Sequence, residues 1–182
     1  DEDRAEILEK AYRQPLDQVF ASFDETPLAS ASISQVHAAT LHDGRRVVVK
    51  VLRPGIEKII YSDVRVLATL ATLANRYWPE ARRLRPVEVV AEYRKTIIHE
   101  LDLMREAGNA AQLRRNFEHN DQLYVPEVHF EYCRSNVMVM ERISGIPVND
   151  IDALRAVDTN LEQLARYGVE IFFTQVFKHN FF

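Results

Sequence analysis

The feature that most constrains the fold is the run Val47-Val48-Val49-Lys50-Val51-Leu52. Its β-branched residues favour a strand, in which successive side chains point to opposite faces. Lys50 therefore shares a face with Val48 and Leu52, and because both faces are apolar, we expect other parts of the chain to cover both. A buried amine needs a carboxylate or phosphate partner. The alternative is a lysine whose methylene stem carries its amine to water at the strand end.

A hairpin is predicted immediately before this lysine. Ser34 to Leu41 reads as the first strand, and His42-Asp43-Gly44 is a turn signal before the second strand, Arg45 to Leu52. A small-residue stretch precedes the hairpin: Ala29, Ser30, Ala31 and Ser32, followed by Ile33. This layout is typical of a nucleotide-phosphate loop, although such loops usually carry glycine. Since alanine restricts the backbone, we expect a stiffer loop with a differently shaped grip on the nucleotide.

Two helices are predicted after the hairpin. Helical periodicity extends from Ile56 to Tyr77, and Pro86 is well placed to begin a long helix that runs to about Phe117. The connection between them contains the basic run Arg82-Arg83-Leu84-Arg85, close to Trp78. Such a run is either a solvated face or a membrane-surface contact.

Three polar residues on the long helix are candidates to meet Lys50. Asp102, Glu106 and Asn109 are spaced by four and three residues, so they share one face. That face could meet the lysine together with a phosphate or metal, or it could be a solvent-facing polar stripe. Glu100 lies about 200° around the helix from Asp102, so it points elsewhere unless the helix is distorted there.

The rest of the chain supplies further strands and helices. Phe23 to Leu28 is a predicted strand, and the remaining predicted elements are strands at 124–132 and 136–142 and helices at 3–12, 15–20, 150–157 and 159–178. The segment Val137 to Val148 is either a core strand with a surface turn or a hinge whose backbone contacts a purine. The order predicts an α+β fold with a five-stranded, mostly antiparallel sheet and helices packed on it.

Composition excludes several classes of protein. The chain has 182 residues, a net charge of −4 and one cysteine, Cys133, so it has no internal disulfide. The acidic balance and the lack of a motif argue against a nucleic-acid partner. No run reaches the roughly 18 apolar residues of a membrane span. The six histidines are scattered, which disfavours a redox-metal hydroxylase.

The order of these signals is that of a protein-kinase-like N-lobe: loop and hairpin, strand lysine, helix glutamate, apolar strand, hinge. The matching segments are PLASASISQVHAA, VVVKV, HELDLMREAGNAAQLRRNF, VPEV, MVMERISGIPV and FFTQVF. Together they resemble the UbiB family of atypical kinases over residues 27–182. The resemblance implies a kinase-like N-lobe with N-terminal helices and a family-specific helical insert at residues 1–143. It also implies a hinge and the first helices of a C-lobe at residues 144–182.

The resemblance also implies roles for individual residues. Lys50 would hold the nucleotide phosphates, Glu106 would pair with it, and Glu100 and Asp102 would form the Glu-x-Asp motif of the family. Asn109 would give possible support to this group. The remaining implied nucleotide-binding residues are Ala29, Ser30, Ala31, Ser32 and Ile33 in the loop, with Met140 as gatekeeper and Glu141 and Ile143 offering backbone groups to adenine.

The function implied by this resemblance is that of an atypical kinase or ATPase needed for ubiquinone biosynthesis. It would bind ATP or ADP with Mg²⁺ at the cytoplasmic side of the bacterial inner membrane, with lipid and other ubiquinone-biosynthesis proteins as partners. The alternative is a nucleotide-switched lipid-binding or complex-organising module with little phosphoryl transfer. The catalytic loop and the Asp-Phe-Gly-type metal motif of the family are expected after residue 182. We therefore assign neither a catalytic residue nor a metal ligand within this chain, and expect no turnover from it alone.

Overall fold

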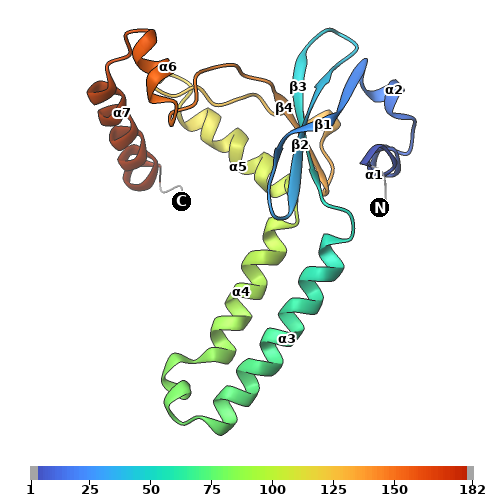
Figure 1. The fold of residues 1–182 in the computed structure, drawn as a ribbon, viewed down its shortest axis with the longest axis vertical. Helices are drawn as coiled ribbons and strands as arrows, with labels where there is room; N and C mark the ends of the chain where they lie inside the picture. Colours follow the sequence, from blue (N-terminus) through green and yellow to red (C-terminus); the bar gives the residue numbers. More distant parts are fainter. Residues whose placement is uncertain (1–3, 180–182) are drawn as a thin grey trace.

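The computed structural model describes residues 4–179 and contains a four-stranded antiparallel sheet with helices on both faces (Figure 1). The strands are β1 (Ser22–Ser30), β2 (Ser34–Thr40), β3 (Arg46–Leu52) and β4 (Val137–Glu141), in the order β1-β2-β3-β4. The helices are α1 (Arg4–Tyr12), α2 (Leu16–Val19), α3 (Ile56–Tyr77), α4 (Pro86–Glu100), α5 (Leu103–Asn116), α6 (Ile151–Ala156) and α7 (Leu161–Phe173). Short helical turns are η1 (Glu80–Leu84), η2 (Phe130–Tyr132) and η3 (Thr174–Lys178). The predicted α+β class is confirmed.

The predicted hairpin before Lys50 is formed by β2 and β3. Lys50 lies opposite Val36 in the register of these two strands. The turn depends on Gly44, which has a φ of +88°, and on Asp43, whose Oδ1 accepts a 3.0 Å hydrogen bond from the Arg45 amide. Glycine suits this position because a left-handed backbone carries little penalty without a Cβ.

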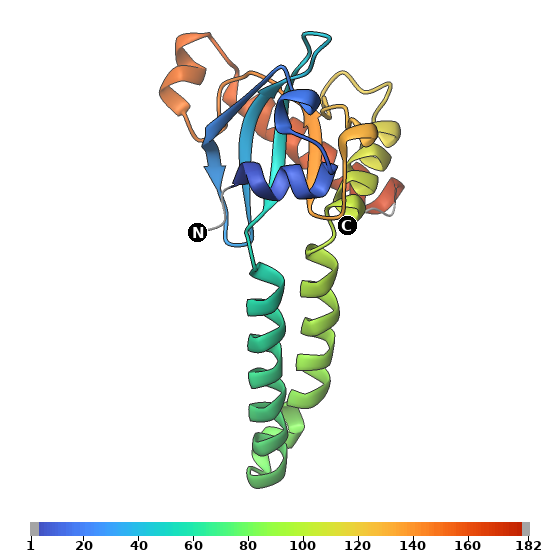
Figure 2. The ribbon, with the colours of Figure 1, turned by 90° about the vertical axis from the view of Figure 1, so that its right-hand side faces the viewer.

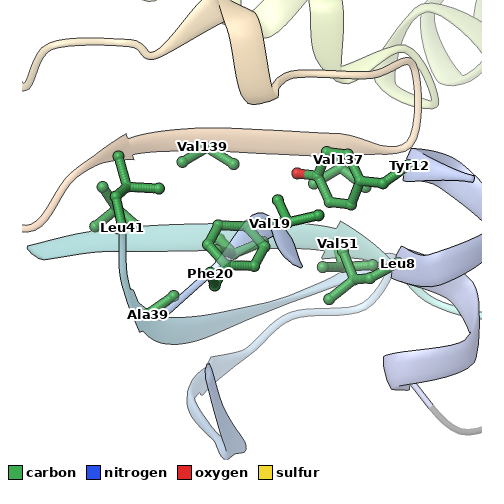
Figure 3. Close-up of a cluster of buried hydrophobic side chains, with 11 residues drawn as sticks. Leu8, Tyr12, Val19, Phe20, Ala39, Leu41, Val51, Val137 and Val139 are labelled. Atoms are coloured by element: carbon green, nitrogen blue, oxygen red, sulfur yellow. The ribbon is translucent and has the colours of Figure 1, made fainter. Parts of the chain in front are cut away.

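Helices α1 and α2 cover one face of the sheet (Figure 3). The three β3 valines on this face, Val47, Val49 and Val51, are 2% exposed or less. The side chains that cover them include Leu8 and Phe20, both almost fully buried. The expectation that the lysine-free face of β3 is covered is therefore confirmed.

Helix α5 and the base of α3 cover the other face, which carries Lys50. Leu103 and Ala107 of α5 are fully buried against Leu52 and Met138 in a second apolar cluster. This cluster holds α5 beside β3, and the expectation that the Lys50 face is covered is confirmed at Leu52 only, since Val48 and Lys50 stay half-buried.

The prediction of five strands is wrong, because residues 124–132 do not form a strand. Val128 makes a single antiparallel bridge to Met140, and the chain then turns through η2. Pro126 contributes to the difference, since proline has no N–H to donate to a sheet.

The prediction of one helix from Pro86 to about Phe117 is also wrong. The helix starts at Pro86 as expected, but it breaks at Asp102, which has an extended backbone and separates α4 from α5. The Asp102 carboxylate accepts a 3.1 Å hydrogen bond from the Met104 amide, and the Leu103 amide donates to the Ser135 carbonyl at 2.8 Å. The distortion that we allowed for between Glu100 and Asp102 is therefore present.

Helices α3 and α4 form a long hairpin that projects away from the sheet (Figure 2). Only the base and middle of α3 contribute buried residues, Ile60, Val64 and Ala71, and α4 contributes none. Across residues 4–179, none of the helices is both long enough and apolar enough to span a bilayer. The predicted lobe boundary at residues 143 and 144 stays a prediction.

Candidate functional site

Lys50 and Glu106 form an ion pair between β3 and α5. The Lys50 Nζ donates to both carboxylate oxygens of Glu106, at 2.6 and 2.7 Å. The Lys50 side chain is 24% exposed and that of Glu106 is 45% exposed, so solvent reaches both charges. An ion pair this exposed adds little to stability, and its main effect is to orient the amine.

The local sequence explains why these two residues meet. Glu106 lies in the first turn of α5, next to Ala107, and Leu103 and Ala107 seat the helix against the sheet. Asp102 caps this helix, since its side chain accepts the hydrogen bond from Met104. A carboxylate in the first turn is also favoured by the positive end of the helix dipole. The break at Asp102 therefore sets the start of α5 and, with it, the position of Glu106.

The Ala-rich loop, residues 29–33, connects β1 to β2. Ala29 and Ser30 end β1, and the Ala31 amide closes the turn by donating to the Ser34 carbonyl at 2.9 Å. Within residues 4–179, positive φ angles occur only at Arg13, Gly44, Gly55, Arg85 and Asp158, all outside this loop. The loop backbone thus needs no glycine, and the alanines occupy it without left-handed strain.

The end of β4 places the predicted gatekeeper on the same face of the sheet as the lysine, and the predicted hinge residues follow it in the chain. Met140 pairs with Val48, so it lies on the same face as Lys50 and packs against the second apolar cluster. The Glu141 amide already donates to the Glu127 carbonyl at 2.8 Å. Because the amide is engaged in this bond, the carbonyl is the Glu141 backbone group that could still contact adenine. Ile143 is 56% exposed in the segment that follows β4.

The Glu141 side chain is also held in place. Its carboxylate accepts hydrogen bonds from the Tyr124 hydroxyl and from the Glu127 amide. These two bonds, the first more than the second, lower the pKa of the Glu141 carboxyl group. The start of the segment after β4 is therefore fixed by side-chain as well as backbone contacts.

The other predicted helix residues do not contact the Lys50–Glu106 pair through any hydrogen bond found among residues 4–179. Glu100 ends α4, Asp102 caps α5, and Asn109 is exposed one turn beyond Glu106. The polar face that we expected to run from Asp102 to Asn109 is interrupted, because Asp102 lies outside the helix.

Two residues near this site escaped the sequence reasoning. Val36 is half-buried on β2 opposite Lys50, beside Val48, which strand alternation had already placed on the Lys50 face. Arg53 contacts the Ala-rich loop through its guanidinium group. No local pattern marks Arg53, because the partners of its side chain lie more than twenty positions away.

The arrangement is suited to binding a phosphorylated ligand. Glu106 orients the ammonium group of Lys50 on the sheet face that also carries the apolar side chains of Val36, Val48 and Met140. An ammonium group is a compact positive charge that donates hydrogen bonds to phosphate oxygens. Over the described range 4–179, no group of three or more His, Cys, Asp or Glu residues is placed to hold a metal ion. The expected Mg²⁺ site stays a prediction.

Comparison with known proteins places this geometry in a family. The sequence model of the family described as ABC1 atypical kinase-like domain matches residues 1–182. Two proteins named "Probable protein kinase UbiB" are 59% identical over 176 residues in Aeromonas salmonicida and 58% identical over 175 residues in Pseudomonas aeruginosa. Each comparison covers 96% of this chain, but only 32% and 33% of the relative. The chain thus spans about a third of the length of these relatives.

A solved structure supports the same assignment. The Rv3197–erythromycin complex from Mycobacterium tuberculosis matches with a TM-score of 0.65 and 29% sequence identity, over 79% of this chain and 37% of that one. The family match over the whole chain, the similarity to proteins named UbiB and the lysine–glutamate pair between β3 and α5 agree with one another. This chain belongs to the ABC1 atypical kinase-like domain family.

Proposed function

We propose that this chain supplies the nucleotide-binding part of an atypical kinase or ATPase that acts in ubiquinone biosynthesis. The observation that carries the proposal is the Lys50–Glu106 pair, which fixes the amine on the sheet face beside the Ala-rich loop. In kinases a strand lysine paired with a helix glutamate contacts the nucleotide phosphates. The family membership and the relatives named as probable protein kinases support this role.

The ligand in this proposal is ATP or ADP with Mg²⁺. The base would lie against the apolar side chains of Val36, Val48 and Met140, with the Glu141 carbonyl and the Ile143 backbone at its edge. Bound Mg²⁺ would neutralise charge on the phosphates. Its ligands would come from the two thirds of the protein that this chain does not span. Lys50 would hold the phosphates, and Glu106 would hold Lys50.

Nucleotide binding by the full-length protein tests this proposal. We expect Lys50→Met to raise the dissociation constants for ATP and ADP by roughly 10- to 100-fold, because a charge-assisted contact with phosphate is lost. Glu106→Gln should have a smaller effect in the same direction. Lys95→Met is a matched control, since Lys95 forms an exposed 2.7 Å ion pair with Glu92 on α4. Wild-type affinity in Lys50→Met would refute the proposal.

The partners in the proposal are a lipid surface and other ubiquinone-biosynthesis proteins, at the cytoplasmic side of the bacterial inner membrane. The observation that supports a lipid contact is the hairpin tip, residues 77–85. Its Tyr77, Trp78 and Leu84 side chains are 65%, 66% and 75% exposed, and three arginines lie among them: Arg82, Arg83 and Arg85. Exposed aromatic and basic side chains together favour the interface of an anionic bilayer.

Sedimentation with anionic phospholipid vesicles tests the lipid contact. Arg82 donates to the Asn75 and Arg76 carbonyls at the end of α3, so its replacement would also disturb the turn. Trp78→Ala and Arg83→Gln are cleaner variants, and each basic residue near such a surface contributes about 1 kcal/mol. We expect both variants to reduce binding, and Arg105→Gln on α5 to leave it unchanged. Unchanged sedimentation of the Trp78 and Arg83 variants would contradict a tip contact.

The exposed tip also favours the second candidate function, a nucleotide-switched lipid-binding module with little phosphoryl transfer. Both functions need the Lys50–Glu106 pair, so nucleotide binding does not separate them. Phosphate release and phosphoryl transfer by the full-length protein do separate them. The 182-residue chain alone is expected to show no steady ATPase rate after contaminant controls. A steady rate would contradict our expectation that the catalytic groups lie elsewhere in the protein.

A further inference from the structure

Arg53 attaches the Ala-rich loop to the end of β3 through three hydrogen bonds. Its backbone amide donates to the Ile33 carbonyl at 2.8 Å. Its Nε donates to the Ala31 carbonyl at 2.9 Å, and its Nη2 donates to the Ser30 hydroxyl at 2.8 Å. The Ser30 hydroxyl also accepts a 3.1 Å hydrogen bond from the side-chain amide of Gln35. The loop is therefore held from outside as well as closed by its own backbone.

We propose that Arg53 is a positioning residue that fixes the Ala-rich loop in the shape in which it meets the nucleotide phosphates. The inference rests on the proposed nucleotide function. Arg53 lies only three residues after Lys50, so one segment of chain carries both the phosphate-binding amine and the group that anchors the loop. The distance between the loop and the amine is then set by β3 and not by the loop alone.

The guanidinium group suits this task better than an ammonium group. Its planar fork offers Nε and Nη2 as two donors at a fixed separation, and these donors bind a carbonyl and a hydroxyl on successive loop residues. A lysine at this position carries the same charge on a single nitrogen, so it cannot present two donor atoms at this fixed separation. Neither acceptor is a carboxylate, and Arg53 forms no ion pair with an acidic residue of range 4–179. The contacts of Arg53 therefore position the loop and do not neutralise an acidic side chain.

Apart from the pairing of Ala29 and Ser30 with β2 and the turn bond from Ala31 to Ser34, the loop has few other restraints. Its four small residues, Ala29 to Ser32, are exposed and contribute little apolar packing, and only Ile33 is half-buried against the second apolar cluster. Movement of the loop away from β3 would break both side-chain bonds of Arg53 while leaving the sheet core intact. Alanine limits the loop's internal freedom, but Arg53 determines where the loop lies relative to Lys50. Loss of the Arg53 side chain should therefore loosen phosphate recognition without unfolding the sheet.

Ligands with and without phosphate test this inference in the full-length protein. For Arg53→Gln and Arg53→Lys we expect the dissociation constants for ATP and ADP to rise roughly three- to tenfold, with little change for adenosine. Ser30→Ala removes one of the two acceptors and should give a smaller rise. Arg46→Gln is the matched control, since Arg46 is an exposed arginine at the start of β3.

Hydrogen exchange supplies a readout of loop position that does not depend on affinity. Exchange at residues 29–34 should speed up in Arg53→Gln and stay at the wild-type rate in Arg46→Gln. A double-mutant cycle between Arg53→Ala and Ser30→Ala should show coupling, because the two side chains are in contact. If Arg53→Ala does not fold, Ser30→Ala and Arg53→Lys still carry the test.

The outcomes separate the two proposals. Full wild-type affinity in Arg53→Lys would show that charge alone suffices, and unchanged loop exchange in Arg53→Gln would show that Arg53 does not position the loop. Either result overturns the inference while the nucleotide function stands, provided that Lys50→Met still loses binding. If the Lys50→Met protein binds ATP like the wild type, the proposed function itself fails.

Discussion

Helices α5 and α3 both carry apolar residues at helical spacing in the sequence but have very different surroundings in the structure. In α5, Leu103 and Ala107 are fully buried against the sheet. In α3, the periodic residues Leu67, Leu70 and Leu73 are 40%, 56% and 46% exposed. The comparison shows that periodicity identifies an apolar stripe but not the surface that covers it.

The difference in burial indicates different roles for the sheet with α5 and for the α3–α4 hairpin. The sheet and α5 fix one another, and the candidate site lies where they meet. The hairpin is attached to this unit only at its base and reaches away from it (Figure 2). We therefore expect substitutions in the first region to change stability or nucleotide binding. Substitutions at exposed positions of the hairpin should change neither and act on its proposed lipid contact.

The largest expected effect is the loss of a fully buried leucine. Leu103→Ala should lower the free energy of unfolding by about 2–5 kcal/mol, because it removes buried apolar atoms and leaves a cavity under α5. The matched change Leu70→Ala, at a residue that is 56% exposed, should stay within about 0.5 kcal/mol of wild type. Urea titration of the full-length protein measures both. Equal losses in the two variants would mean that the hairpin is packed as tightly as the site.

A smaller effect is expected at the start of α5. Asp102→Ala removes the cap on the Met104 amide, which typically costs about 1 kcal/mol of stability. Asp102→Asn keeps an acceptor at the same place and should restore most of this loss. Comparison of the two variants by urea titration checks the capping role. A nucleotide-binding defect in a fully stable Asp102→Asn protein would show a role beyond capping.

The smallest effect is expected at alkaline pH and concerns Tyr12. Burial raises the pKa of Tyr12, with Arg134 nearby acting in the opposite direction, and its hydroxyl donates to the Tyr132 carbonyl at 2.7 Å. In the unfolded chain tyrosine ionises near pH 10, whereas the folded protein retains this proton. The contribution of Tyr12 to stability should therefore be constant below about pH 10 and fall as the pH rises above it.

Tyr12→Phe provides the measurement. It should flatten the decline in the unfolding midpoint between about pH 10 and pH 11, although it loses one hydrogen bond at all pH values. Tyr93→Phe, on the exposed hairpin, serves as the control. An alkaline decline that is identical in wild type and Tyr12→Phe would assign the effect to other groups.

Much of the site follows from local sequence. The alternation around Lys50, the turn at Gly44 and the helical placement of Glu106 all depend on nearby residues, and the structure contains the hairpin and brings the two charges together. The break at Asp102 does not follow in this way, because one of the hydrogen bonds that stabilise it comes from Ser135, more than thirty residues away. Helical periodicity continues through the break and conceals it.

Contacts between residues that are distant in sequence also explain the other differences between the prediction and the structure. Residues 124–132 have strand-like composition, but the pairing with β4 is limited to the bridge at Val128. The contacts of Arg53 depend on the register of β1, β2 and β3, which places the end of β3 beside the loop. Register joins residues that are distant in sequence, so composition and periodicity do not specify it. Helical spacing made Glu106 one of three candidate partners for Lys50, and the family resemblance selected it among them.

The interruption at Asp102 also has a mechanical consequence. An unbroken helix from residue 86 to 116 would form a rod of about 46 Å, and any tilt of the hairpin would swing Glu106 away from Lys50. In the structure the helix is interrupted at Asp102, and α3, the other helix of the hairpin, follows β3 through Gly55, whose φ is +68°. Both helices of the hairpin therefore connect to the rest of the molecule through non-helical residues. A tilt of the hairpin would therefore not be carried to Glu106 along one continuous helix.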